Sequence, residues 1–571
     1  MSWVLKKKYH DLLAREDGHQ KKVWGDALTV CLAWPNLYRA GMSNLGFQTI
    51  YALLNRYPSF LCERIFLPDP GEETEFALRS APLFSLESQR PLADFDIIAF
   101  SLSFENDYPN ILKILDMGRV TLDARQRKET EPFVIGGGIS VTLNPEPLAD
   151  IFDLFLLGEG EEVLPEFLHT FEVSRRRGLT RDEILFYIQK EIRGAYVPKC
   201  YRVTYRTDHL IESIEPVDPL FPEKIEKRWI TDINTFTTEQ GITTPDAEFG
   251  GMFLTEVSRG CQRGCRFCAA GFVCRPARFR AVSTLKPSFS RGIEKQKKVG
   301  LLGTAVSDHP DLPSLCRSVL EQGGEVAIGS LRLDRLNHEI VALLKETGVE
   351  TVSLAPEAGT QRLRDIIHKG ITTDHIFNAV ELLIEHGITN IRLYFMVGLP
   401  TETDEDIEAV IHLAKKIKHH AISYSAGRRR FKRIVLSINQ FIPKPATPFQ
   451  WQPLEDVNTV RRRIRRITSA LGREGAIKVV HDLPKWSYIQ ALLSLGDRLV
   501  GRILFSVHRH HGNWSQAFKE VNVNPDFYVY RQKGIDEILP WDFIDHGIGR
   551  QLLINEYRRA LLPKEWNGCS L

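Results

Sequence analysis

Three cysteines in the segment 256–280 are the residues whose types and spacing best suit chemistry. Cys261, Cys265 and Cys268 follow the pattern C-x-x-x-C-x-x-C. Thiolates on such a loop can hold three irons of a four-iron cluster, whereas a fully ligated cluster uses four cysteines. The fourth iron then has an open coordination position, where a metal centre can bind and activate a second molecule. The spacing therefore predicts an iron–sulfur site with one open position.

A zinc site is the main alternative for these cysteines. Zinc prefers four ligands, usually as two spaced pairs. Only Cys265 and Cys268 have pair-type spacing, and no second C-x-x-C or H-x-x-x-H follows them. Cys274 lies six residues past Cys268, where we do not expect a ligand. We therefore interpret the three cysteines as ligands of a [4Fe–4S] cluster.

The loop RGCQRGCRFC resembles that of the radical SAM superfamily. The resemblance implies that the open iron chelates the amino and carboxylate groups of S-adenosylmethionine. One electron would then cleave the sulfonium and yield a 5′-deoxyadenosyl radical. It also implies contacts to S-adenosylmethionine at successive strand ends: polar groups near the amine, a glutamate on the ribose and backbone under the adenine. The residues at the matching positions are Gly303, Ser307, Asp308, Ser330, Arg332, Glu357, Val397 and Gly398.

Alternating strands and helices must position these residues. Residues 1–193 have the pattern of a Rossmann-like, doubly wound parallel sheet, since buried-strand runs such as 95–104 lead into turns and helices. Residues 194–250 read as a hairpin and a connection. In 251–451, six strand–helix units fit a partial (β/α)6 barrel of the TIM type, with functional groups at the carboxyl ends of the strands. Residues 452–571 have a mostly helical pattern.

The N-terminal half resembles a cobalamin-binding Rossmann-like domain. The resemblance implies that loops after successive strands hold the corrin and its nucleotide tail. The residues in these loops are Ser101, Ser103, Gly136, Gly137, Gly138, Gly158 and Gly160. The usual Asp-x-His-x-x-Gly loop, whose histidine ligates cobalt, is absent, because the place after the first strand reads NLYRAGMSNLGFQ. Either cobalamin binds without a protein histidine, or the domain lacks the cofactor and is structural.

Composition narrows the classes of function. The 571 residues carry a net charge of +2, with 43% hydrophobic and 26% charged residues, which is ordinary for a soluble globular protein. We expect no membrane span and no signal peptide, because no apolar run is long enough. Nine cysteines in a long chain favour a reducing compartment, so we expect a cytoplasmic protein. The Arg-rich segments 428–433 and 461–466 leave nucleic-acid binding open, but the small net charge favours solvated helix faces.

These observations predict a radical SAM enzyme that needs a reductant such as flavodoxin or ferredoxin. The sequence identifies neither its substrate nor the residue that acts on it. If cobalamin binds, we expect a methyltransferase that depends on it. The alternatives are RNA or protein modification similar to that of methylthiotransferases, without cobalamin, or a non-catalytic iron–sulfur protein for electron transfer or sensing. Contacts to S-adenosylmethionine argue against the last of these, because an electron carrier needs none.

Overall fold

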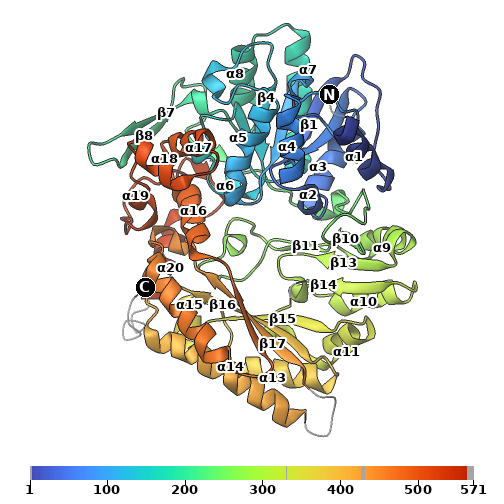
Figure 1. The fold of residues 1–571 in the computed structure, drawn as a ribbon, viewed down its shortest axis with the longest axis vertical. Coiled ribbons are helices and arrows are strands. Elements are labelled where there is room, and N and C mark those ends of the chain that lie inside the picture. The colour runs from blue at the N-terminus through green and yellow to red at the C-terminus, as the bar shows by residue number, and fades with distance from the viewer. Residues whose placement is uncertain (1–2, 330, 426–430, 562–571) are drawn as a thin grey trace. The chain divides into compact units, whose positions relative to one another are not determined.

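The computed structural model describes residues 3–329, 331–425 and 431–561, and the chain folds into two compact units (Figure 1). The first unit contains Met1–Gly251, Leu492–Tyr528 and Asp536–Gly547. The second unit contains Met252–Ala491, Val529–Ile535 and Ile548–Leu571. Both combine helices with parallel sheets, which confirms the predicted α/β class. The more detailed assignments, a Rossmann-like domain and a partial (β/α)6 barrel, remain predictions.

A six-stranded sheet in the order β2-β1-β3-β4-β5-β6 forms the core of the first unit. Its strands are β1 (Leu28–Trp34), β2 (Phe60–Phe66), β3 (Ile97–Ser101), β4 (Phe133–Gly137), β5 (Leu154–Leu156) and β6 (Ala195–Tyr196). The first five run parallel, and β6 pairs antiparallel with β5. The strand order reverses between β1 and β3. In open parallel sheets, ligands bind beyond the carboxyl ends of strands at such a reversal.

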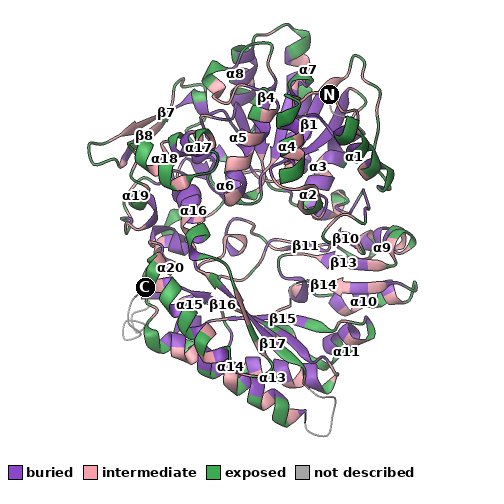
Figure 2. Ribbon diagram, viewed as in Figure 1, coloured by how far each residue is buried: buried purple, intermediate pink, exposed green. Residues whose placement is uncertain are grey.

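The strands of the six-stranded sheet are largely buried, and α3 and α4 start at local capping signals. Figure 2 shows the buried residues concentrated in the strands, with exposed positions on the outer sides of the helices. Asn44 caps α3 by accepting from the Phe47 amide, and Asp69 with Glu72 forms a capping box at α4. The helices are α1 (Trp3–Ala14), α2 (Tyr38–Gly41), α3 (Leu45–Arg56), α4 (Pro70–Leu78), α5 (Tyr108–Met117), α6 (Ile139–Leu143), α7 (Gly160–Arg176), α8 (Arg181–Glu191), α17 (Val500–Arg509) and α18 (Trp514–Glu520).

Two parallel sheets form the second unit. One has the order β10-β13-β14 and the other β15-β16-β17-β18. Their strands are β10 (Phe253–Glu256), β13 (Lys298–Leu302), β14 (Glu325–Ile328), β15 (Thr351–Glu357), β16 (Asn390–Val397), β17 (Arg433–Gln440) and β18 (Ile477–His481). The helices are α9 (Val282–Gln296), α10 (Leu312–Leu320), α11 (His338–Glu346), α12 (Gln361–Ile366), α13 (Thr373–Glu385), α14 (Asp404–Tyr424), α15 (Val457–Leu471) and α20 (Arg550–Leu561). One continuous hydrophobic core joins strands and helices of both sheets.

All six strands expected in 251–451 form, and one further strand joins them. β18 lies within the region expected to be mostly helical and pairs parallel with β17, from Ile434 with Ile477 to Ile438 with His481. None of its five residues is fully buried, so its hydrophobic pattern is weak. The hairpin expected in 194–215 also forms, as β7 (Tyr201–Tyr205) and β8 (Ile211–Pro216).

Segments from 452–571 contribute to both units. The short strand β19 (Ile544–Asp545) pairs in parallel with β9 (Ile225–Glu226) in the first unit, whereas α15 and α20 belong to the second. α16 (Pro484–Leu495) contains the point where the chain passes from the second unit to the first, and α19 (Pro525–Val529) a point of return. A search of the helices among the described residues finds none that is long and apolar enough to cross a membrane.

Candidate functional site

The cysteine loop of the second unit leaves β10 and is closed at its base by two short strands. β11 (Ser258–Arg259) and β12 (Arg278–Phe279) pair antiparallel on either side of it. Gly260, directly before the first cysteine, has a φ of +79°, and a Cβ there would lie 2.0 Å from the carbonyl oxygen of Cys274. Only glycine fits this approach, so the backbone at Gly260 determines where the cysteine run begins.

The three predicted ligands are free thiols with different surroundings. Cys265 is buried, and Cys261 and Cys268 are partly exposed. Burial raises the pKa of Cys265, while the nearby charges of Lys369 and Arg332 oppose that rise. Burial also raises the pKa of Cys268, against hydrogen bonds from the backbone amides of Gly271 and Ala270. Amide donors and cations stabilise thiolates, the form that binds iron, so this set of donors fits a cluster held by three cysteines.

Contacts from distant segments fix the shape of the loop. The Arg266 amide donates to the Ile367 carbonyl (3.0 Å), and its guanidinium donates to the Ile366 carbonyl (2.7 Å). Arg266 also pairs with Glu556 of α20 at 3.0 Å. His368 Nδ1 lies 3.1 Å from the Gly264 carbonyl oxygen. The spacing of residues in the sequence singled out none of these anchoring residues. Ile366, Ile367 and His368 lie in the segment PEAGTQRLRDIIHKG (356–370).

A network of ion pairs joins the loop to the ends of β13 and β14. Arg263, inside the loop, donates two hydrogen bonds to Asp308, at 2.8 and 3.0 Å. Burial alone would raise the pKa of Asp308, but Arg263 and the charges of Arg332 and Arg335 bring it below its usual value. The Ser307 hydroxyl accepts from the Arg332 amide at 2.9 Å. Three of the predicted residues, Ser307, Asp308 and Arg332, therefore meet beside the cysteine loop.

Glu357 joins the same network through a lysine that the sequence did not single out. Lys369 Nζ donates to Glu357 Oε1 at 2.8 Å, and its carbonyl oxygen accepts from Arg332 at 3.3 Å. Both side chains of the pair are almost buried. Glu357 has a φ of +67°, and the register with β16 shifts at this residue. A non-glycine residue in the left-handed region costs free energy, and such residues cluster at functional sites.

Most of the remaining residues predicted to contact S-adenosylmethionine make contacts within the protein itself. Gly303 lies close to Ser258, whose Oγ would be 2.3 Å from an added Cβ. Val397 is fully buried, and the Gly398 amide donates to Glu402 Oε2 at 2.7 Å. Gly398 has a φ of +85°, which lets the chain turn directly after β16. Ser330 lies outside the described residues.

In the first unit, the predicted cofactor residues follow β3, β4 and β5. Ser101 ends β3, and Ser103 is exposed in the following loop. At three of the predicted glycines, other parts of the chain occupy the space that a Cβ would need. These neighbours are Phe155 at Gly136, the Leu102 carbonyl at Gly138 and the Arg228 carbonyl at Gly158. Gly160 begins α7 next to Ile50. At Gly137 the nearest atom is 3.5 Å away, which is ordinary contact.

Two exposed apolar residues and one buried histidine lie near these loops and were not predicted from the sequence. Phe104 and Ile139, after β3 and β4, are 44% and 38% exposed. His546 Nε2 lies 2.9 Å from the carbonyl oxygen of Thr142 in α6, and burial lowers the pKa of this histidine to about 4. The motif PWDFIDHGIG (540–549) contains this histidine and could have drawn attention to it.

Two cavities of the first unit lie away from the predicted cofactor loops. One, of about 220 Å³, is lined by residues from α1, β2 and α4, including Arg64. The other, of about 490 Å³, has a mixed charged lining that includes Arg125, Asp150 and Arg502. None of the seven predicted cobalamin residues lines either cavity.

Comparisons with known proteins match families to two parts of the chain. The family described as "Radical SAM proteins, N-terminal" matches residues 46–198, and the "Radical SAM superfamily" matches residues 255–414. The uncharacterized protein MJ0966 of Methanocaldococcus jannaschii is 30% identical over 83% of this chain and 90% of its own length. The uncharacterized methyltransferase PH0819 of Pyrococcus horikoshii is 24% identical over 50% of this chain and 58% of its own length.

Solved structures that align with the chain have low identity. The radical S-adenosylmethionine methyltransferase TsrM of Kitasatospora setae aligns with a TM-score of 0.48 and 14% identity, over 72% of this chain and 75% of its own. The cobalamin-dependent S-adenosylmethionine radical enzyme OxsB aligns with a TM-score of 0.48 and 13% identity, over 94% and 79%. Two findings establish the family: the two family matches, and the relative from Methanocaldococcus jannaschii, whose alignment covers most of this chain and most of that protein. This chain belongs to the radical SAM superfamily.

Proposed function

We propose that Cys261, Cys265 and Cys268 hold the [4Fe–4S] cluster and that the charged strand ends beside them bind S-adenosylmethionine. Proteins of the superfamily use both cofactors. When bound, the cluster supplies the electron that cleaves S-adenosylmethionine and starts radical chemistry. The observation that carries the proposal is the linkage of the thiol loop to carboxylates at separate strand ends, through Arg263 and Lys369.

The ion pairs around the loop suit a zwitterion with ribose hydroxyls. An ionised carboxylate has about four acceptor positions. Asp308 and Glu357 can therefore accept from an ammonium or a hydroxyl of the ligand while they keep their cationic partners. Lys369 and Arg332 place positive charge beside Cys265, which stabilises its thiolate.

Replacement of Cys265 by serine tests the cluster assignment. The wild-type chain, reconstituted without oxygen, should bind about four irons and release 5′-deoxyadenosine from S-adenosylmethionine after reduction, or S-adenosylhomocysteine when added cobalamin accepts the methyl group. Cys265→Ser should lower the iron content and abolish both products, because serine cannot replace the thiolate. Cys274→Ser is the matched control and should keep iron and products. Equal iron content in wild type and Cys265→Ser would refute the assignment.

For the first unit, we propose cobalamin as a second cofactor at the carboxyl ends of β3 and β4. When bound, cobalamin supplies a cobalt centre that can carry a methyl group. Phe104 and Ile139 present apolar surface at these strand ends, and Gly137 leaves room for close approach. Residues 97–160 contain no histidine, and His546 is engaged with Thr142, so the cobalt would have no imidazole from these loops. The relative named a methyltransferase adds support for methyl transfer as the reaction.

An absorbance titration of the full-length protein with hydroxocobalamin tests this second cofactor. Phe104→Asp should weaken binding at least tenfold, because the apolar corrin would meet a charged side chain. Phe186→Asp is the control, since Phe186 is 43% exposed on α8 of the same unit, away from these loops. If wild type and both variants give the same titration, or if the wild type binds no cobalamin, the proposal is wrong.

A radical modification without cobalamin is the second candidate function. The ribosomal protein uS12 methylthiotransferase RimO of Thermosipho africanus is 22% identical over 46% of this chain and 62% of its own length. In that case S-adenosylmethionine cleavage would proceed with no cobalamin in the protein. A reduced cluster that cleaves no S-adenosylmethionine under any condition would instead indicate an electron-transfer or sensor protein.

A further inference from the structure

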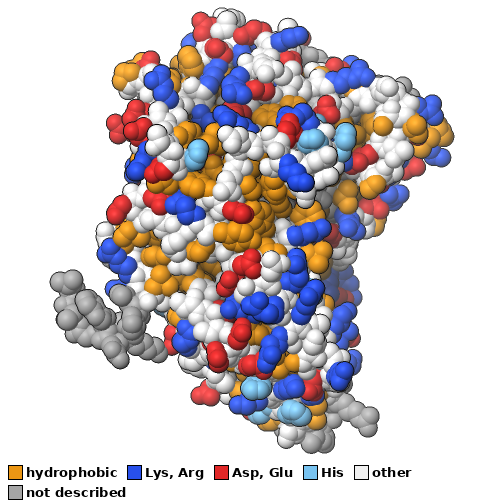
Figure 3. All heavy atoms as spheres, turned by 60° about the vertical axis from the view of Figure 1, so that its left-hand side comes forward, with side chains coloured by type: hydrophobic (Ala, Val, Ile, Leu, Met, Phe, Trp, Pro, Cys, Tyr) orange, Lys and Arg blue, Asp and Glu red, His pale blue; other side chains and the backbone are white. Residues whose placement is uncertain are grey.

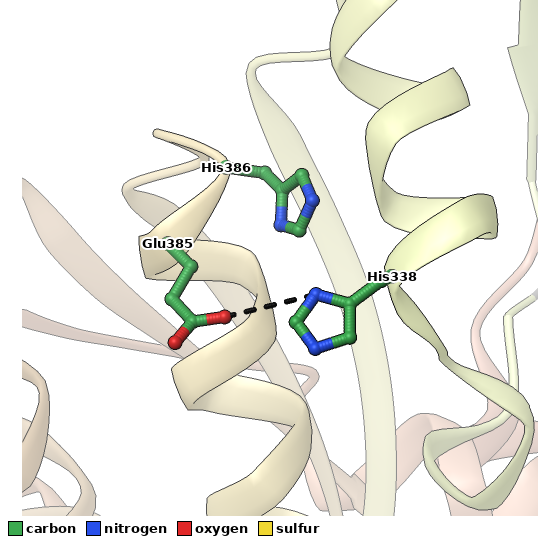
Figure 4. Close-up of side chains that lie close together, drawn as sticks. All are labelled: His338, Glu385 and His386. Atoms are coloured by element: carbon green, nitrogen blue, oxygen red, sulfur yellow. Dashed lines mark ion pairs between the residues drawn. The ribbon is translucent and has the colours of Figure 1, made fainter.

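Two histidines and a glutamate meet at the ends of two helices in the second unit, at a place that uses none of the cysteine-loop residues. His338 begins α11, Glu385 ends α13 and His386 follows it, and Figure 4 shows the three side chains turned toward one another. One potential ligand atom from each lies within 4.8 Å of the others. His338 Nδ1 is 3.8 Å from Glu385 Oε2, and the centroids of the His338 and His386 rings are 5.5 Å apart.

Hydrogen bonds to neighbouring groups orient two of the three donors. His386 Nδ1 lies 2.8 Å from the Leu382 carbonyl oxygen, which can only accept, so Nδ1 carries the proton and Nε2 keeps its lone pair in the neutral ring. Glu385 Oε1 accepts from the Tyr424 hydroxyl of α14, while Oε2 faces His338. Metal-binding histidines and carboxylates are typically held by outer contacts of this kind.

Charges of both signs lie near the site. Glu385 is acidic, and the last carbonyl groups of α13 carry the negative end of the helix dipole. Lys345 of α11 opposes this, because its Nζ donates to the Gly387 carbonyl at 3.4 Å. Basic and histidine side chains are frequent over the lower part of the face drawn in Figure 3, which belongs to this unit. The cluster thus combines one carboxylate and the helix dipole with the positive charge of Lys345 nearby.

We propose that His338, Glu385 and His386 form a binding site for a divalent transition metal of the zinc type. Imidazole nitrogen and carboxylate oxygen are zinc donors, and zinc binds them at about 2.0–2.2 Å. The donor atoms must close to roughly 3.5 Å from one another around a tetrahedral ion of that size. The His338 side chain is 74% exposed and can rotate to do so. The fourth position is left to water, and the ion ties the start of α11 to the end of α13.

Zinc titration of the full-length protein with its cluster in place tests this site. The loaded cluster occupies the thiols of Cys261, Cys265 and Cys268, which would otherwise compete for zinc. A chelating dye that loses zinc to the protein reports affinity and stoichiometry. Wild type should take up one equivalent, and His338→Ala and His386→Ala should each bind at least a hundredfold more weakly. Tyr424→Phe should weaken binding about tenfold, since it removes only an outer contact.

The control is His412→Ala, which removes an exposed histidine of α14 that is not a donor of this cluster. It should leave zinc uptake unchanged. Zinc uptake that is the same in wild type, His338→Ala and His386→Ala would overturn the proposal, as would a wild type that takes up zinc only at millimolar concentration. A melting temperature that zinc raises in wild type but not in His338→Ala would add support independent of the dye.

Discussion

Glu402 shows how one buried carboxyl group responds to its surroundings. Burial raises its pKa to about 7, against the Gly398 amide and the charge of Arg463, and with the charges of Asp406 and Glu455 adding to the rise. An unfolded glutamate titrates near 4.5. Between these values the folded chain binds more protons than the unfolded one, so the free energy of unfolding falls as pH rises from about 4.5 to 7.

Glu402→Gln should remove this pH dependence, because the amide has no proton to lose. Relative to wild type, the variant should gain stability as the pH rises from 5 to 8, by up to about 3 kcal/mol for the full shift. Chemical denaturation at a series of pH values measures it. Glu346→Gln, on the exposed side of α11, should follow the wild-type profile. Parallel profiles for Glu402→Gln and wild type would contradict the raised pKa.

Sequence spacing predicted the donors at the cysteine loop, but not the charged residues that hold them. The thiols lie within eight residues of one another, so their pattern is local. Lys369, by contrast, reaches Glu357 and the surroundings of Cys265 only when β15 and α12 are folded. Arg263 and Asp308 are 45 residues apart in the chain. Such ion pairs leave no periodic signal, and a sequence of ordinary composition contains many other candidate pairs.

The cysteine loop depends, as an element, on one backbone conformation at its start. Gly260→Ala would place a Cβ 2.0 Å from the Cys274 carbonyl and force a positive φ on alanine. Each such strained position costs about 1–3 kcal/mol. We expect a lower iron content after reconstitution and a lower melting temperature. Gly475→Ala is the control, since an added Cβ there meets no atom within 4 Å. Equal iron content in both variants would show that the loop tolerates the shift.

The strands were easier to predict than their sheet partners. Long apolar runs marked β10 and β13 to β17, because both faces of a parallel strand are covered. β18 is short and half-buried, so its pattern did not separate it from the helical region around it. In the first unit, glycine turns at 136–138 and 158–160 suggested ligand loops, yet Gly138 and Gly158 are required by neighbouring carbonyl groups. A glycine in a sequence does not reveal whether a ligand or the chain itself occupies the space beside it.

At the scale of the whole molecule, the chain alternates between its two units near the C-terminus. It passes from one to the other at 251, 491, 528, 535 and 547. The first unit therefore includes segments that are synthesised long after its six-stranded sheet. β9 can pair with β19 only after these segments have been made. During synthesis from the N-terminus, the six-stranded sheet emerges first but lacks these pieces. Neither unit can complete its fold until residues from 492 onward, roughly the last seventh of the chain, have left the ribosome. Both units therefore depend on protection from aggregation at the late stage of synthesis.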